Sequence, residues 1–187
     1  FGFRTEVAIS PDGTKFAYIK HTDLGGEIYI RDLLSLDSDR RLANFTGPTS
    51  GKLGFSEDAE WVIYLDNLSM MRVRVEGGAP QVVMPSNVDV SSMYASEQDF
   101  YYTTRDSRQL ARVGPGNGGQ PEILTSTEGG LGFYWPRLLP GGTHMLITSS
   151  SAPFSVTTTG RVELLDLNTL ERQVLIESAF NAQYVRS

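Results

Sequence analysis

Few residues in this chain could support nucleophilic catalysis. Residues 54–58 approach the Gly-x-Ser-x-Gly elbow of serine hydrolases, but Asp58 stands where the elbow needs its second glycine. The two histidines, His21 and His144, have no second histidine or carboxylate at the spacing of a ligand pair. Cysteine is absent, which excludes thiolate nucleophiles and cysteine-based metal sites. We therefore predict no catalytic residue, no metal site and no cofactor, and we interpret residues 54–58 as a hairpin turn.

Three other segments approach the patterns of ligand-binding loops. Residues 114–119 are rich in glycine but lack the lysine of a phosphate-binding loop. Residues 130–135 lack the third glycine of a dinucleotide fingerprint, and no crossover helix is expected after them. Residues 37–39 resemble the start of a calcium loop without its glycine and distal glutamate. We interpret all three segments as turns.

The composition excludes several classes of protein. With 187 residues, 40% of them hydrophobic and 20% charged, the chain can bury a substantial core and is not disordered. Its 16 basic and 22 acidic residues give a net charge of -6, so it lacks the cationic surface that binds phosphates, and we predict no nucleic-acid partner. No apolar run approaches the roughly 20 residues of a membrane span, so we predict no membrane insertion.

The strands that would position any functional site are arranged in an internal repeat of the sequence. The sequence Ser-Pro-Asp-Gly at residues 10–13, flanked by two apolar-rich segments, has the chemistry of a hairpin turn. Degenerate copies follow at residues 56–59, 95–98 and 139–142, at intervals of 39 to 46 residues. Ala59 replaces the glycine of the first copy, which costs on the order of 1 kcal/mol if this alanine is left-handed.

A second signal has the same period. A third strand with apolar residues is expected after each hairpin, at residues 27–31, 70–75, 109–113 and 161–165. Turns follow each of these strands, two of them with the pattern Gly-Gly-x-Pro at residues 77–80 and 118–121. A fourth strand then closes each unit. Four-stranded units with a period of about 40–45 residues are typical of propeller blades.

We therefore predict an all-β chain with the fold of a β-propeller. It has four complete blades of four antiparallel strands and the first strand of a fifth, in a single domain over residues 1–187. The repeats span residues 5–43, 44–84, 85–125 and 126–176, and residues 177–187 begin the next blade. The alternative is a β-sandwich, whose strands also alternate with turns. A sandwich does not predict that the Gly-Gly-x-Pro turn recurs in phase with the hairpin.

Three segments carry a resemblance to a known family. Residues 10–13 with the strand after them, residues 71–80 and residues 135–142 resemble the WD-like repeat of TolB-type β-propellers. The chain also resembles the propeller module appended to bacterial serine/threonine kinases and to some transcriptional regulators. The resemblance covers essentially the whole chain and implies a ring of about six blades. A ring of four blades and a fraction would expose sheet edges, so we expect either a contracted ring or partner chains, including further copies of this chain, at its ends.

Tyr134, Trp135 and Arg137 are the predicted binding residues. Trp, Tyr and Arg dominate binding hot spots, and this group is the richest of its kind in the chain. Propellers bind their partners where loops of several blades converge. The alternative is that these aromatic side chains pack between blades. For Tyr101 and Tyr102 we expect packing in the core.

The expected function is that of a non-catalytic module in a larger bacterial protein, which acts as a protein-interaction or sensing platform with a protein partner. The resemblance implies a soluble module in an extracytoplasmic or periplasmic location. Two alternatives stay open: the propeller that gates a serine peptidase similar to prolyl oligopeptidase, and a periplasmic assembly protein of the envelope similar to TolB. The domains that flank this segment in its parent protein would distinguish them.

Overall fold

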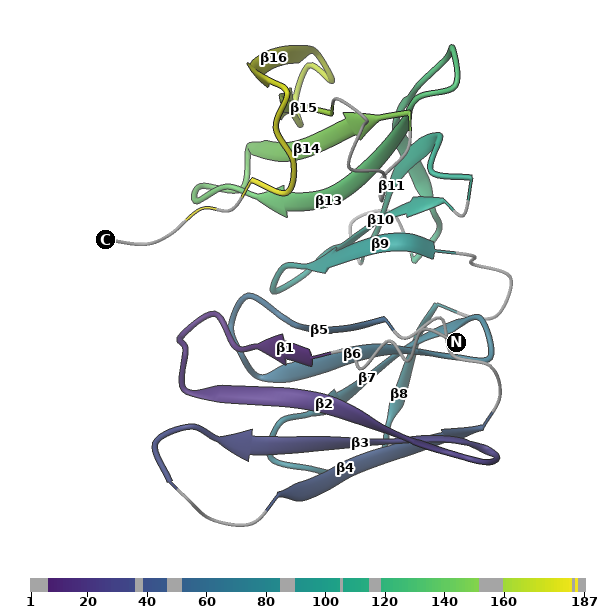
Figure 1. Cartoon of the computed structure of the whole chain (residues 1–187), viewed down its shortest axis with the longest axis vertical. Helices are drawn as coiled ribbons and strands as arrows, with labels where there is room; N and C mark the ends of the chain where they lie inside the picture. Colours follow the sequence, from purple (N-terminus) through teal and green to yellow (C-terminus); the bar gives the residue numbers. More distant parts are fainter. Residues whose placement is uncertain are drawn as a thin grey trace. The chain divides into compact units, whose positions relative to one another are not determined.

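The computed structural model describes residues 7–35, 39–46, 52–84, 90–104, 106–114, 119–151, 160–182 and 184. These residues form 16 β-strands and no helix, arranged as four antiparallel sheets of four strands (Figure 1). In each sheet the strands are neighbours in the order in which they follow along the chain. The prediction of an all-β chain with four-stranded antiparallel blades is confirmed. The chain divides into two compact units of two sheets each.

The first unit contains the sheets of the first two repeats. Its first sheet consists of β1 (Val7–Ile9), β2 (Lys15–Thr22), β3 (Gly25–Asp32) and β4 (Arg40–Thr46). Its second sheet consists of β5 (Leu53–Phe55), β6 (Trp61–Asp66), β7 (Ser69–Arg74) and β8 (Gln81–Met84). The predicted turn at residues 77–80 connects β7 to β8.

The second unit contains the remaining two sheets. Its first sheet consists of β9 (Val90–Ala95), β10 (Phe100–Thr104), β11 (Gln109–Val113) and β12 (Glu122–Ser126). Its second sheet consists of β13 (Gly132–Leu138), β14 (His144–Ser150), β15 (Arg161–Asp166) and β16 (Arg172–Glu177). The predicted turn at residues 139–142 falls between β13 and β14. The predicted turn at residues 95–98 falls between β9 and β10, although these four residues are grouped with the first unit.

Some predicted features are not represented by a strand or lie outside the described residues. The first strand of a fifth blade was expected over residues 177–187, but β16 ends at Glu177 and residues 178–182 and 184 belong to no strand. Residues 183 and 185–187 lie outside the described residues, as do residues 37, 38 and 115–118 of the predicted turns and residues 152–159. The single-domain assignment over residues 1–187 stays a prediction.

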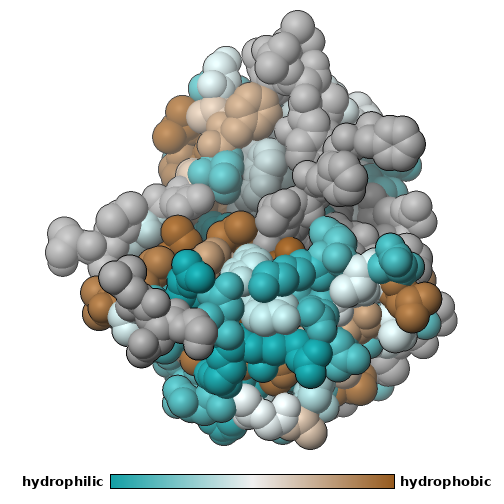
Figure 2. Space-filling model, turned by 60° about the horizontal axis from the view of Figure 1, so that its bottom comes forward, coloured by the Kyte–Doolittle hydropathy of each residue, from teal (hydrophilic) through white to brown (hydrophobic). Residues whose placement is uncertain are grey.

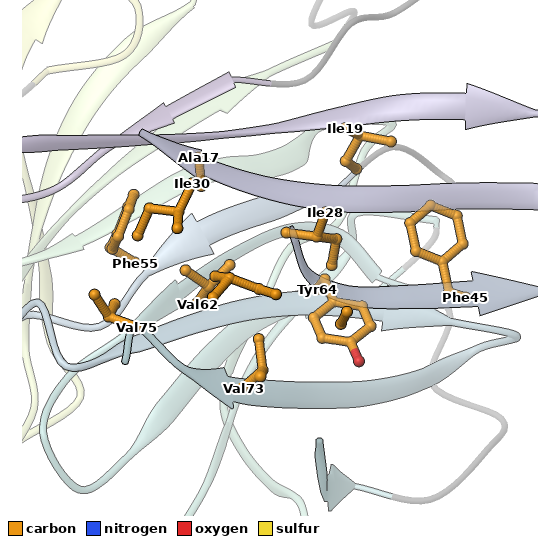
Figure 3. Close-up of a cluster of buried hydrophobic side chains, with 12 residues drawn as sticks. Ala17, Ile19, Ile28, Ile30, Phe45, Phe55, Val62, Tyr64, Val73 and Val75 are labelled. Carbon is orange, nitrogen blue, oxygen red and sulfur yellow. The ribbon is translucent and has the colours of Figure 1, made fainter. Parts of the chain in front are cut away.

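Each unit has its own hydrophobic core between its two sheets. In the first unit Ile28 of β3 points toward Tyr64 of β6, and both side chains are at most 1% exposed (Figure 3). The ring of Phe45 on β4 lies 6.3 Å from that of Tyr64. In the second unit the fully buried Phe133 of β13 packs with Leu110 of β11 and with other apolar residues of both sheets. Buried and partly exposed residues alternate along most of β3, whereas four successive residues of β6 and of β10 are buried, so these two strands are covered on both faces.

The predicted Ser-Pro-Asp-Gly turn is held by its own side chains. The Ser10 hydroxyl donates to Asp12 Oδ1 at 2.5 Å and accepts the backbone N–H of Lys15 at 2.9 Å. Asp12 Oδ1 also accepts the backbone N–H of Thr14 at 3.0 Å. Gly13 is left-handed with a φ of 71°, as this turn chemistry requires.

The same set of contacts recurs at two other turns. Ser56 and Asp58 reproduce it between β5 and β6, and Ala59 is left-handed there with a φ of 59°, as expected from its place in the repeat. Thr104 and Asp106 reproduce it between β10 and β11, at a turn that is not one of the copies of the repeat in the sequence. The hairpin interpretation of residues 54–58 is therefore confirmed, because Ser56 is a turn residue rather than a nucleophile.

We expect the Asp12 carboxylate to make the stability of the first unit depend on acid. The Ser10 hydroxyl, followed by the Thr14 backbone and side chain, holds the pKa of Asp12 at about 2, below its ordinary 3.8. A depressed pKa in the folded state means that the stabilisation is present above about pH 4 and is lost as the pH falls through about 2. Asp12→Asn should therefore lower the urea midpoint at pH 6, and the difference from the wild type should shrink toward pH 2. A difference that stays constant over this range would contradict the prediction, and Asp23→Asn in the exposed β2–β3 turn is the control.

The strands at two sheet edges leave apolar side chains on the surface. Ile9 of β1 is 64% exposed and Ile176 of β16 is 53% exposed, and all six residues of β16 are exposed. On the face shown in Figure 2, hydrophilic side chains cover much of the described surface and hydrophobic ones lie scattered among them. Apolar residues on an edge strand are a site where another chain can pair. Coverage of these edges by partner chains or by further copies stays a prediction.

Candidate protein-binding site

A β-bulge on β13 determines how the three predicted binding residues are presented. Tyr134 pairs with Thr148 and Arg137 pairs with Leu146 on β14, and the register shifts between them. Because Leu146 and Thr148 are two residues apart on one strand, they point to the same face of the sheet. Tyr134 and Arg137 are therefore successive side chains on that face, and Trp135 lies within the bulge.

The backbone of Trp135 is held in an unfavourable conformation. Its φ is 49°, in the left-handed region, which costs a residue with a bulky side chain roughly 1–2 kcal/mol. Its N–H donates to the hydroxyl of Ser92 on β9 at 3.1 Å instead of to the neighbouring strand. Ser92 Oγ in turn lies 2.9 Å from Thr103 Oγ1. Strained positions that the surroundings hold in place concentrate at functional sites.

Three aromatic rings meet at the bulge. The rings of Tyr134 and Trp135 are tilted by 48° with centroids 5.7 Å apart. The ring of Phe180 meets that of Trp135 edge to face, with centroids 6.5 Å apart and planes at 87°. This is the geometry that aromatic pairs prefer. Tyr134 and Trp135 are half-buried and Phe180 is 41% exposed, so the group combines contact area with accessibility.

The segment that carries Phe180 is fixed to the same sheet. The N–H of Ala179 donates to the carbonyl of Gly160 at 3.0 Å, and the N–H of Asn181 donates to Thr148 Oγ1 at 3.1 Å. A Cβ at Gly160 would lie 2.5 Å from the Phe180 ring, so only glycine leaves room for the ring there. The position of Phe180 beside Trp135 is thus set by backbone contacts and not by the rings alone.

Arg137 is a partly buried cation beside these rings. Its guanidinium lies 5.8 Å from the centroid of the Tyr94 ring, and its Nη1 donates to the carbonyl of Pro136 at 3.1 Å. Burial lowers the pKa of Arg137, against a smaller opposing effect of Tyr94. Within the described part of the chain, no carboxylate forms an ion pair with this guanidinium. We call Tyr94, Tyr134, Trp135, Arg137 and Phe180 the β13 cluster.

The structure adds two residues that sequence reasoning did not assign to the site. Tyr94 directly precedes the predicted turn at residues 95–98 and Phe180 lies near the predicted start of a fifth blade, and neither stands out from its neighbours in the sequence. Of the two residues expected in the core, Tyr101 is 3% and Tyr102 5% exposed, and Tyr101 packs in the core that contains Phe133. Tyr134 and Trp135 are half-buried, and both their binding role and the alternative of packing between blades stay predictions.

One pair of titratable residues was not expected from spacing. His144 Nε2 lies 3.5 Å from Asp166 Oδ2, because the β14–β15 register places the two residues opposite each other. The side chains are 40% and 31% exposed, and Asp166 Oδ1 accepts the N–H groups of Asn168 and Thr169 in its turn. These backbone hydrogen bonds lower the pKa of Asp166. The pair therefore stabilises a surface turn.

Among the residues that the structure describes, no three His, Asp or Glu side chains are grouped so that they could hold a metal ion. The same residues contain no helix long and apolar enough to cross a membrane.

Comparison with known proteins identifies the fold. No protein-family model matches this sequence, and no curated protein sequence does. Among solved structures, TolB from Acinetobacter baumannii is similar over 97% of this chain, with a TM-score of 0.69 and 20% identity. The β-propeller domain of Cps50 (Swd1) from Myceliophteria thermophila is similar over 95%, with a TM-score of 0.67 and 14% identity. Oligogalacturonate lyase from Vibrio parahaemolyticus is similar over 91%, with a TM-score of 0.62 and 15% identity.

This chain spans about half of the length of those structures: 46%, 57% and 52%, respectively. At such low identities the likeness establishes the fold. The chain has the fold of a TolB-like, WD-like β-propeller, with four complete blades, as the repeat predicted.

Proposed function

We propose that this chain is a non-catalytic propeller module that binds a protein partner through the β13 cluster, as an interaction or sensing platform in a larger bacterial protein. The observation that carries the proposal is the conformation of Trp135. A bulky residue is held left-handed at a β-bulge, and its ring lies between Tyr134 and the 41% exposed Phe180. A tryptophan that only filled a core would not need a strained backbone at the edge of that core.

The chemistry of the described residues supports a binding role over catalysis. Ser56 is committed to its turn, and the pair of His144 and Asp166 serves another turn. The β13 cluster instead joins Trp, Tyr and Arg, the three residue types that contribute most at protein interfaces. An extracytoplasmic location is part of the proposal and is supported by the likeness to TolB in fold. The gating propeller of a serine peptidase and an envelope assembly protein stay as alternative predictions.

We expect Trp135→Ala to abolish capture of the partner while the propeller stays folded. Immobilised wild-type chain and variant would be exposed to an extract of the producing organism, and specifically retained proteins would be quantified by mass spectrometry. Truncation of a hot-spot tryptophan weakens binding by at least about 30-fold, from a loss of about 2 kcal/mol or more. Trp135→Gly is a second variant without the ring, and its backbone suits the left-handed conformation.

The matched control for this experiment is Trp61→Ala. Trp61 is the other tryptophan of the chain and lies under the guanidinium groups of Arg72 and Arg74, at 4.1 and 4.5 Å from its ring centroid. The Trp61→Ala substitution should leave capture of the partner unchanged. If both Trp135 variants unfold, as judged by far-UV circular dichroism, the ring serves packing and the proposal fails. Equal capture by folded wild type and variants would also overturn it.

A further inference from the structure

Arg137 differs from six other arginines because no carboxylate of the described residues forms an ion pair with it. Six described arginines form an ion pair with a carboxylate, and the distances are between 2.5 and 3.2 Å: Arg31, Arg41, Arg74, Arg112, Arg161 and Arg172. Arg137 is half-buried. Its one hydrogen bond within the described residues goes to the adjacent carbonyl of Pro136. A guanidinium has five N–H donors, so most of them are not used by these contacts.

Withdrawal of a charge from water is unfavourable unless an opposite charge or several hydrogen bonds compensate. Contact with the Tyr94 ring compensates in part, since the face of an aromatic ring attracts a cation. The guanidinium is planar and presents its N–H donors in a fixed fork. This geometry suits a carboxylate that accepts two parallel hydrogen bonds. Arg137 is thus prepared for an anion that the described part of this chain does not supply.

The surroundings of Arg137 indicate what accompanies the anion. Because of the bulge, Tyr134 is its neighbour on the same face of the sheet, and the Tyr134 ring continues into those of Trp135 and Phe180. A bare phosphate or other polar ion would gain little from this aromatic wall. A carboxylate attached to an apolar or aromatic group would use both parts at once.

We infer that Arg137 binds a carboxylate of the partner protein, presented next to an apolar or aromatic side chain that packs on Trp135 and Phe180. The inference rests on the proposed function and specifies the ligand of the same site. The carboxylate is either the C-terminus of the partner or the side chain of an Asp or Glu. Loss of the guanidinium removes a charge-assisted, bidentate contact, which is worth about ten- to a hundredfold in affinity.

The test uses small probes that carry this chemistry, titrated into ¹⁵N-labelled wild-type chain. N-acetyl-L-phenylalanine represents a C-terminal carboxylate beside an aromatic group and N-acetyl-L-aspartyl-L-phenylalaninamide a side-chain carboxylate beside one, and N-acetyl-L-phenylalaninamide is the uncharged control. The chain contains two tryptophans, so the indole N–H resonance of Trp135 is assigned with a Trp61→Phe variant. At least one acid probe should move that resonance saturably, and the amide probe should bind at least about tenfold more weakly.

Arg137→Met should remove the preference for the acid, and Arg137→Lys should keep a part of it, because lysine retains the charge but not the fork. Arg72→Met, which removes a guanidinium stacked on the other tryptophan, should change nothing. Equal binding of acid and amide probes, or an unchanged preference in Arg137→Met, would overturn the inference. If Arg137→Met does not fold, the Lys variant decides alone, and full acid preference there would contradict the bidentate contact. If capture of a partner depends on Trp135 but binding of the probes does not depend on Arg137, the carboxylate ligand is refuted. The proposed function stands in that case.

Discussion

Replacing Phe133 with alanine is expected to destabilise the second unit by about 3–5 kcal/mol, the range measured for buried phenylalanines. Phe133 is fully buried in β13 and packs with Met145, Ile147 and Leu165 of its own sheet and with Leu110 of the neighbouring one. Its removal takes apolar surface out of the core and leaves a cavity that β13 cannot close, because the strand is fixed by its pairing with β14.

The loss is measured by urea unfolding, followed by the fluorescence of Trp135 in a Trp61→Phe background and by far-UV circular dichroism. Ile123→Ala on β12 is the matched control in the same unit, since Ile123 is 47% exposed and should change stability by less than about 1 kcal/mol. A loss below 1 kcal/mol in Phe133→Ala would show that the two sheets of this unit do not share the core described above.

The second large effect is expected at Glu163, whose side chain is 4% exposed in the centre of the β15 strand. Its Oε1 lies 3.0 Å from Arg161 Nε and its Oε2 lies 3.2 Å from Arg172 Nη1, and it accepts the Ser149 hydroxyl as well. The Arg172 guanidinium also covers the ring of Phe133 at 5.0 Å. One carboxylate therefore pairs with two cations and ties three strands together at the edge of the core.

We expect Glu163→Gln to destabilise the chain by about 2–3 kcal/mol, because both guanidinium groups lose their counter-charge. The effect is smaller than for a fully buried pair, since Arg161 and Arg172 are 39% and 31% exposed and water can solvate them. Glu122→Gln is the control: the Arg112–Glu122 pair is shorter, at 2.6 Å, but its side chains are 31% and 44% exposed. It should change the free energy of unfolding by at most about 1 kcal/mol. Equal losses in the two variants would contradict the burial argument.

The blades could be predicted from the sequence because their signals are local. The turn at residues 10–13 and its copy at 56–59 encode their own hydrogen bonds through Ser, Asp and a left-handed residue, and the strands beside them follow from alternation. The same contacts form at Thr104 and Asp106, but this turn connects the second and third strands of its blade and falls outside the repeat. Similar chemistry at a different place in the blade is therefore not visible as a repeat.

The candidate site could be predicted in part only. Residue types identified Tyr134, Trp135 and Arg137, but the β-bulge that places Tyr134 beside Arg137 depends on the pairing of β13 with β14. Phe180 comes to Trp135 through backbone contacts with Gly160 and Thr148, which are 20 and more residues away. Register between distant strands likewise brings His144 to Asp166. Composition and spacing carry little information on such long-range pairings.

The central claim is that the β13 cluster is the surface by which this module contacts a protein. The most direct measurement is photo-crosslinking in the producing cells, with a benzophenone amino acid placed at position 134, and at position 18 on β2 as the control. Tyr134 lies in the cluster, whereas Tyr18 stacks between Phe16 and Tyr29 in the other unit. We predict a discrete adduct of higher mass at position 134 that disappears with Trp135→Ala, and none at position 18. The absence of an adduct at position 134, or the same adducts at both positions, would contradict the account.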